Sequence, residues 1–145
     1  MSAQSLGTQP VNSNRTAQPF RNSAATPKSQ ASGALVTALA MMGAPMSFAR
    51  NVEVFGEGEA AEYLYQVRTG CIRTYKVLND GRRQVSAFYL PGDVFGIEAG
   101  DEHKVSAEAI VPSMVTVVKR SLLNSRASGD STLARQLFDL SVSEL

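Results

Sequence analysis

The sequence is poor in the residues on which several classes of protein depend. It contains one cysteine, Cys71, one histidine, His103, and no tryptophan. A single cysteine excludes an internal disulfide framework and an all-cysteine zinc or iron–sulfur site within one chain, and it favours a reducing, cytoplasmic location. One histidine cannot supply a cluster of imidazole ligands or a convincing catalytic triad. We therefore expect no metal, no cofactor and no enzymatic activity.

The sequence also lacks a large excess of positive or negative charge, and it lacks long apolar runs. Fourteen Lys and Arg residues against 13 Asp and Glu residues leave a formal net charge of +1, so the chain lacks the strong positive field of a dedicated nucleic-acid binder. The longest apolar stretch, residues 33–46, is interrupted by Thr37 and Gly43. It is shorter than the roughly 20 apolar residues of a membrane-spanning helix, so we expect no membrane partner.

The first 52 residues contain no acidic residue, and the first one in the chain is Glu53. Residues 1–32 consist mainly of Ser, Gln, Asn, Thr, Ala and Pro, with isolated Arg15, Arg21 and Lys28. Such a segment cannot bury enough surface to offset its ordering entropy, so we predict a disordered tail. Its Ser-rich, Arg-containing and acid-free composition also fits an organellar transit peptide.

The remaining residues alternate between helical and extended patterns. Residues 34–42 are good helix formers, with Leu35 and Leu39 on one face and Gly43 as a stop. After that the hydrophobic period becomes two, which is typical of short antiparallel strands. The predicted strands are residues 52–55, 63–68, 71–78, 84–90, 105–111 and 114–119, and the helices that follow are residues 121–128 and 132–145, with Leu133, Leu137 and Leu140 on one face.

Turn residues separate these strands. The Asp80-Gly81 pair supplies the positive φ that a tight hairpin requires, and Pro91-Gly92 between Leu90 and Asp93 matches a type II turn. Short strands with glycine-rich corners, followed by helices, indicate an antiparallel sandwich or roll. We predict a mainly β fold, an antiparallel β-roll (jelly roll) over residues 33–145 with short helices at both ends. Its structural turn residues are Gly58, Gly70, Gly81, Pro91, Gly92 and Asp93.

Three segments in this order resemble the β-roll of CRP/FNR transcription regulators. They are residues 58–70, the hairpin turn at residues 79–82, and residues 90–96 with the sequence Leu-Pro-Gly-Asp-Val-Phe-Gly. The set is more specific than any single Pro-Gly-Asp turn, because such turns are common in β proteins. Residues 107–110 and 134–141 are similar to the FixK group of this family.

The resemblance implies a cyclic-nucleotide-binding-like effector domain of a regulator of the nitrogen-fixation type. In the family, a long dimerisation helix and a DNA-binding helix-turn-helix follow the roll, and we expect this chain to end before both. The full-length protein is then expected to bind palindromic DNA as a homodimer and to contact RNA polymerase, where Arg82 and Arg83 of the hairpin are candidate contacts. The chain alone is expected to be a monomer or weak dimer without specific DNA binding.

The resemblance also gives the candidate ligand pocket, namely Gly96, Ile97, Glu98, Lys104 and Ser106. Cyclic-AMP binders of this family carry a Glu for the ribose where this chain has Ile97, and an Arg-Ser pair for the phosphate where it has Lys104 to Ser106. A lysine offers a point charge instead of a bidentate fork, so we expect no cyclic-nucleotide binding. The alternative keeps binding through Glu98, Lys104 and Ser106. Residues 1–70 lack cysteine, which excludes an FNR-type iron–sulfur sensor.

The single histidine and the single cysteine each allow a prediction, and the histidine also bears on an alternative fold. We expect His103, in an acidic segment, to lie in a solvated loop, and Cys71 to be a small buried hydrophobic residue with Arg73 as a candidate basic neighbour. The rival is a stand-alone cupin-like ligand-binding protein or metal-dependent enzyme. That class holds its metal with several histidines and a carboxylate, and the single histidine argues against it.

Overall fold

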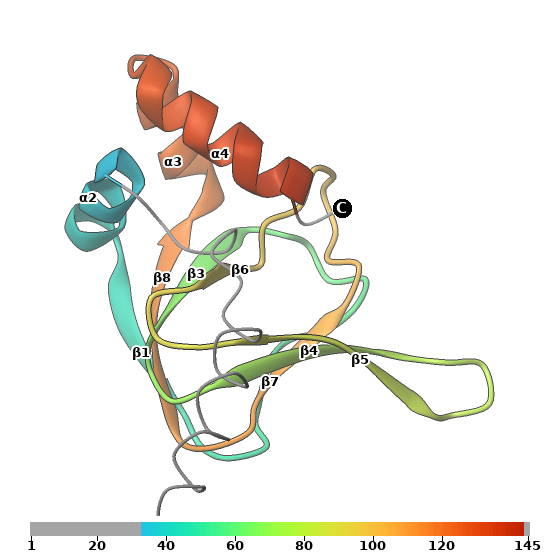
Figure 1. Ribbon diagram of the computed structural model, residues 1–145. Coiled ribbons are helices and arrows are strands. Elements are labelled where there is room, and N and C mark those ends of the chain that lie inside the picture. The colour runs from blue at the N-terminus through green and yellow to red at the C-terminus, as the bar shows by residue number, and fades with distance from the viewer. Residues whose placement is uncertain (1–32, 144–145) are drawn as a thin grey trace, which may run out of the picture.

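The protein is a β-roll with its helices gathered at one end (Figure 1). The computed structural model describes residues 33–143, so the predicted tail of residues 1–32 and the last two residues lie outside it. Two four-stranded antiparallel sheets have the orders β1-β8-β3-β6 and β2-β7-β4-β5. The strands are β1 Ala44–Phe48, β2 Glu53–Phe55, β3 Tyr63–Thr69, β4 Ile72–Val77, β5 Arg83–Tyr89, β6 Val94–Phe95, β7 Ser106–Ala109 and β8 Ser113–Lys119; the helices are α2 Gly33–Met42, α3 Arg120–Ala127 and α4 Ser131–Ser143.

This architecture confirms the predicted fold class, and two strands are additional to the prediction. Strand β1 is mostly exposed, lies at the edge of its sheet and contains Pro45, a residue that sheets tolerate at their edges. It therefore lacks the alternating burial that identifies a strand from sequence. Strand β6 has only two residues, too few to show any period. Among the predicted strands, residues 105–111 shorten to Ser106–Ala109.

Two apolar clusters stabilise the molecule. The sheet core lies within the roll and contains Phe55, Tyr65, Val67, Ile72, Tyr89, Phe95, Ala107, Ala109 and Val115. The helix core joins the helices to the roll and contains Leu35, Ala38, Leu39, Leu64, Val94, Ile97, Val118, Leu123, Leu133 and Leu140, with Leu137 packed against it. The predicted apolar face of α4 is thus confirmed. Strands β3, β6 and β8 contribute residues to both cores because successive side chains on a strand point to opposite faces.

The two predicted turns bring the strands of the roll together. At the β4–β5 hairpin the Gly81 N–H donates to the Leu78 carbonyl at 2.9 Å, and Gly81 has a φ of 89°. At the turn before β6 the Asp93 N–H donates to the Leu90 carbonyl at 2.8 Å, and the Gly92 N–H donates to Val67 of β3 at 2.8 Å. The second turn therefore fixes where β6 begins and where the loop after it starts.

Candidate functional site

The loop between β6 and β7, residues 96–105, carries four of the five predicted pocket residues. It runs beside the corner that precedes β3, and backbone hydrogen bonds join the two segments. The Gly58 N–H donates to the His103 carbonyl at 2.8 Å, the His103 N–H to Glu59 at 2.9 Å, and the Ala61 N–H to Asp101 at 2.8 Å. Residues 96–105 contain no helix, and these hydrogen bonds hold their backbone against the corner before β3.

Gly96 and Ile97 lead the chain from β6 into this loop. Gly96 has a φ of +82°, and a Cβ atom there would lie 2.6 Å from Cδ1 of Tyr65. Burial raises the pKa of the Tyr65 phenol to about 12, with smaller contributions from Tyr63 and nearby carboxylates. Ile97 is 8% exposed and belongs to the helix core. Ile97, where the resemblance implies a ribose-binding Glu in cyclic-AMP binders, is thus an apolar packing position in this chain.

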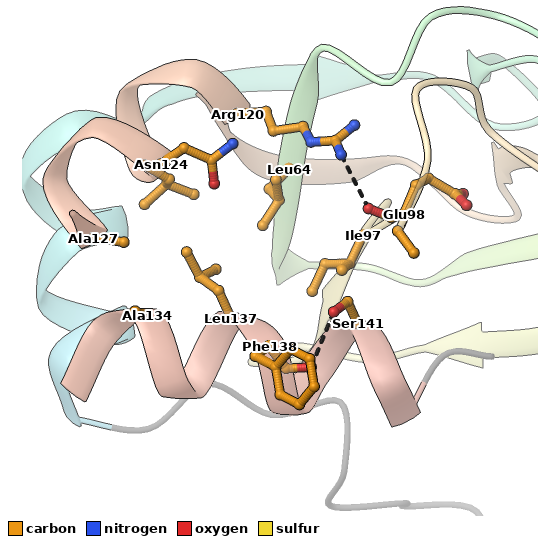
Figure 2. A pocket seen from close by; sticks show the side chains of 12 residues that line it. Leu64, Ile97, Glu98, Arg120, Asn124, Ala127, Ala134, Leu137, Phe138 and Ser141 are labelled. Carbon is orange, nitrogen blue, oxygen red and sulfur yellow. Dashed lines mark hydrogen bonds between the residues drawn. The ribbon is translucent and has the colours of Figure 1, made fainter. Parts of the chain in front are cut away.

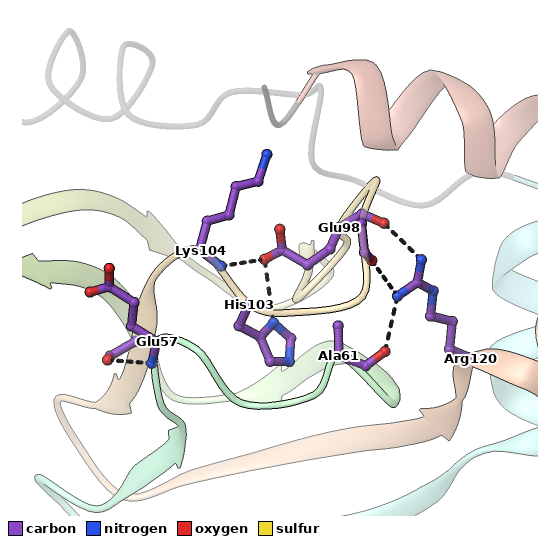
Figure 3. A network of polar contacts seen from close by, with 8 residues as sticks. Glu57, Ala61, Glu98, His103, Lys104 and Arg120 are labelled. Carbon is purple, nitrogen blue, oxygen red and sulfur yellow. Dashed lines mark hydrogen bonds and ion pairs between the residues drawn. The ribbon is translucent and has the colours of Figure 1, made fainter.

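The remaining polar groups of the predicted pocket point to different places. The Ser106 hydroxyl accepts the Glu57 N–H at 2.9 Å, and Ser106 is 8% exposed. Lys104 is exposed, and its side chain extends away from the network drawn in Figure 3. A phosphate is held best by clustered N–H donors and cations. In this structure the Ser106 hydroxyl is engaged by the Glu57 N–H, and the Lys104 side chain is exposed.

His103 is buried, so the expectation of a solvated histidine was wrong. Its residue exposure is 2%, and its ring stacks on Phe55 with a centroid distance of 3.6 Å and an interplanar angle of 10°. The His103 Nδ1 lies 3.3 Å from Oε2 of Glu98. The acidic neighbours in the sequence suggested solvent, whereas the contact with Phe55 of β2 decides the burial.

Arg120, which no sequence pattern singled out, holds the other side of the loop. It is the first residue of α3. Its Nη1 donates to the carbonyls of Gly100 at 2.7 Å and Ala61 at 3.1 Å, and its Nη2 donates to the Glu98 carbonyl at 3.2 Å. Figure 3 shows the guanidinium between these segments. Only the position of a basic residue directly after the last strand could have drawn attention to it.

A cavity of about 440 Å³ lies between the roll and the two last helices. Figure 2 shows Leu64, Ile97 and Leu137 around it, with Phe138 at one side and Arg120 and Glu98 near its polar end. Ile97 and Glu98 line this cavity, whereas Gly96, Lys104 and Ser106 are not among its lining residues. Two of the five residues of the predicted pocket therefore line this cavity.

Cys71 and Arg73 occupy separate environments. Cys71 is partly buried, and desolvation by burial, followed by the nearby Asp93, raises the pKa of its thiol. Arg73 pairs with Glu108 at 2.6 Å, which leaves the suggested pairing with Cys71 without support. A raised pKa keeps the thiol protonated and poorly nucleophilic, in keeping with a structural cysteine.

Within residues 33–143, no helix is long and apolar enough to cross a bilayer. Likewise, three or more His, Cys, Asp or Glu side chains do not gather anywhere in residues 33–143 in a way that could hold a metal ion.

Comparison with known proteins identifies the relatives of this fold. The family described as "Cyclic nucleotide-binding domain" matches residues 45–128. The nitrogen fixation regulation protein FixK of Azorhizobium caulinodans is 43% identical over 136 residues, which cover 94% of this chain and 53% of that protein. The fumarate and nitrate reduction regulatory protein of Vibrio cholerae is 33% identical over 95 residues, which cover 64% of this chain and 38% of that protein.

A solved structure also resembles this chain in sequence and fold. FixK2 from Bradyrhizobium japonicum superposes with a TM-score of 0.69 and 48% sequence identity, over 71% of this chain and 52% of that one. The chain thus spans about half the length of FixK from Azorhizobium and of the solved FixK2. FixK of Azorhizobium caulinodans and the Vibrio cholerae protein are both named as regulatory proteins.

Proposed function

This chain belongs to the cyclic nucleotide-binding domain family, and we propose that it is the effector domain of a FixK-like transcription regulator that works without cyclic nucleotide. The similarity to FixK and to the fumarate and nitrate reduction regulator supports the regulatory role. One observation carries the second part of the proposal. Ile97 packs in the helix core at the position where nucleotide-binding members of the family present a glutamate.

The chemistry of a cyclic nucleotide supports the same conclusion. Its ribose hydroxyls require a hydrogen-bond acceptor, and its phosphate requires a cation with oriented donors. The carboxylate of Glu98 already accepts the Lys104 N–H at 3.3 Å and lies beside His103. The Ser106 hydroxyl is also engaged, with Glu57. If a nucleotide used these groups, its binding would therefore have to replace internal hydrogen bonds, two of which are partly buried, at a cost in free energy.

Isothermal titration calorimetry with cyclic AMP and cyclic GMP tests this proposal on the 145-residue chain. We expect no heat of binding at millimolar nucleotide. The control is Ser106→Ala, because Ser106 occupies the position that the family uses for phosphate. Saturable binding that the Ser106→Ala variant loses would show a working nucleotide site and would contradict the proposal.

The full-length regulator, we propose further, acts in the cytoplasm as a DNA-binding homodimer that contacts RNA polymerase, with the β-roll of residues 33–145 as its effector unit. DNA recognition is expected from a part other than this chain, because 14 basic and 13 acidic residues give it a net charge of only +1. In an electrophoretic shift assay, residues 1–145 should show no preference for a palindromic operator over scrambled DNA. Selective retardation of the operator would overturn this expectation.

A further inference from the structure

The loop of residues 96–105 is anchored on two sides by the protein itself. On one side it follows the corner before β3 through the bonds of Gly58, His103 and Ala61. On the other side it meets the first residue of α3, where Arg120 donates three hydrogen bonds to carbonyl groups of the corner and the loop. A loop without regular structure depends on such partners because its backbone groups otherwise bond to water.

Glu98 connects the two sides. Its carbonyl oxygen accepts from Nη2 of Arg120 at 3.2 Å, while its carboxylate lies 3.3 Å from the ring nitrogen of His103 and accepts the Lys104 N–H. The carboxylate is largely buried, with a side-chain exposure of 10%, and the His103 side chain is 1% exposed. One residue thus binds the helix end through its backbone and the buried histidine through its side chain (Figure 3).

We propose that Arg120, Glu98 and His103 form an internal tie that holds this loop in one conformation without a ligand. The inference rests on the proposed function, because it explains how an effector domain without cyclic nucleotide keeps its loop ordered. Charged donors such as a guanidinium make stronger hydrogen bonds than neutral ones. Arg120 directs two of its nitrogen atoms at the loop and corner carbonyls, and among residues 33–143 no carboxylate forms an ion pair with it.

The tie also links the loop to the helices. Arg120 begins α3, and its own N–H donates to the Glu62 carbonyl at 2.8 Å, so its backbone is fixed on the roll while its side chain reaches the loop. Helices α3 and α4 contact each other and share the helix core. The conformation of the loop and the position of the helices are therefore set together. In this design the loop is a permanent support for the helices instead of a ligand-operated switch.

Hydrogen–deuterium exchange of the full 145-residue chain tests the tie. Arg120→Lys keeps the charge but loses the fork that reaches three carbonyls. We expect the amides of Ala61, His103 and Lys104 to exchange on the order of tenfold faster than in the parent chain, with β8 amides unchanged. Arg126→Lys, at an exposed position of the same helix, is the matched control and should leave the loop unchanged.

A second pair of variants tests the side chain of Glu98. Glu98→Gln keeps an oxygen acceptor for the Lys104 N–H, whereas Glu98→Ala removes it, so only Glu98→Ala should accelerate exchange in the loop. This pair decides the matter if Arg120→Lys fails to fold. Unchanged loop exchange in both Arg120→Lys and Glu98→Ala, or equal acceleration throughout β3 and β8, would overturn the tie. Slower loop exchange of the parent chain with millimolar cyclic AMP would instead overturn the proposed nucleotide independence.

Discussion

Gly96 has a structural role, because its backbone has a positive φ and lies close to the ring of Tyr65. Its φ of +82° is unfavourable for other residues, and a Cβ atom would lie 2.6 Å from the ring of Tyr65, which is 6% exposed and cannot move freely. We expect Gly96→Ala to lower the free energy of unfolding by about 2 kcal/mol. Urea denaturation followed by tyrosine fluorescence measures this change.

The chain supplies a matched control for this substitution. Gly100 lies in the same loop, but open space surrounds the position of its missing Cβ, and its φ lies outside the left-handed region. Gly100→Ala should therefore change the free energy of unfolding by less than about 0.5 kcal/mol. Equal denaturation midpoints for Gly96→Ala and Gly100→Ala would show that the contact with Tyr65 has no energetic weight.

The sequence predicts the role of a single residue when that role depends on its neighbours in the chain, and not when it depends on distant residues. The turn at Gly92 depends on neighbours in the chain, and its positive φ is present. His103 is buried against Phe55, which is distant in the sequence. The acidic residues around the histidine therefore led to the wrong prediction of a solvated side chain. Arg120 acts through backbone carbonyls, and carbonyls carry no sequence signature. The tie could not have been predicted from residue types alone.

In addition to the backbone pairing of β4 with β7, one buried carboxylate contacts both strands of the β4–β5 hairpin. Glu108 of β7, whose side chain is 7% exposed, pairs with Arg73 at 2.6 Å and with Arg83 at 2.9 Å. The Arg83 guanidinium also lies 4.2 Å from the centroid of the Tyr75 ring, which favours a cation–π contact. Among residues 33–143, the ion pair of the adjacent Arg82 is with the exposed Asp80, at the tip of the hairpin. Two neighbouring arginines thus have different structural roles.

Arg83→Ala and Arg82→Ala separate these roles. Because Arg83 is half exposed, its ion pair is partly screened, and we expect Arg83→Ala to destabilise the fold by about 1 kcal/mol. Arg82→Ala should leave the urea midpoint unchanged, because exposed pairs contribute little. Both midpoints are read by the same urea titration. A larger loss for Arg82→Ala than for Arg83→Ala would contradict this assignment.

At the level of elements, length and edge position limit what a sequence reveals. The hairpin strands β4 and β5 flank an Asp-Gly turn, and their predicted bounds lie within one residue of the observed ends. Strand β1 has no buried face to show a period of two. Unlike β5, which is also an exposed edge strand, it is not joined to a predicted strand by an Asp-Gly hairpin turn. Helix α4 was predicted from the spacing of its leucines, and two of them, Leu133 and Leu140, lie in the helix core.

The whole molecule is held together by strands that serve two cores at once. On β3, Leu64 packs in the helix core, while Tyr65 and Val67 pack in the sheet core. On β8, Val118 and Val115 are divided in the same way. Loss of packing in the helix core therefore loosens the same strands that build the roll. This sharing predicts that helices and roll unfold in one cooperative transition.

Leu133→Ala tests that cooperativity from the helix side. Leu133 lies in α4 and is 1% exposed, so removing its side chain should cost about 2 to 4 kcal/mol. If the two cores act as one unit, urea midpoints followed by circular dichroism at the helix band and by tyrosine fluorescence should fall together, because Tyr65 and Tyr89 report on the sheet core. Leu122→Ala, which is 50% exposed on α3, is the control and should shift neither midpoint. A helical signal lost before the tyrosine signal would mean that the helices are a separate unit, and would contradict the shared role of β3 and β8 in the two cores.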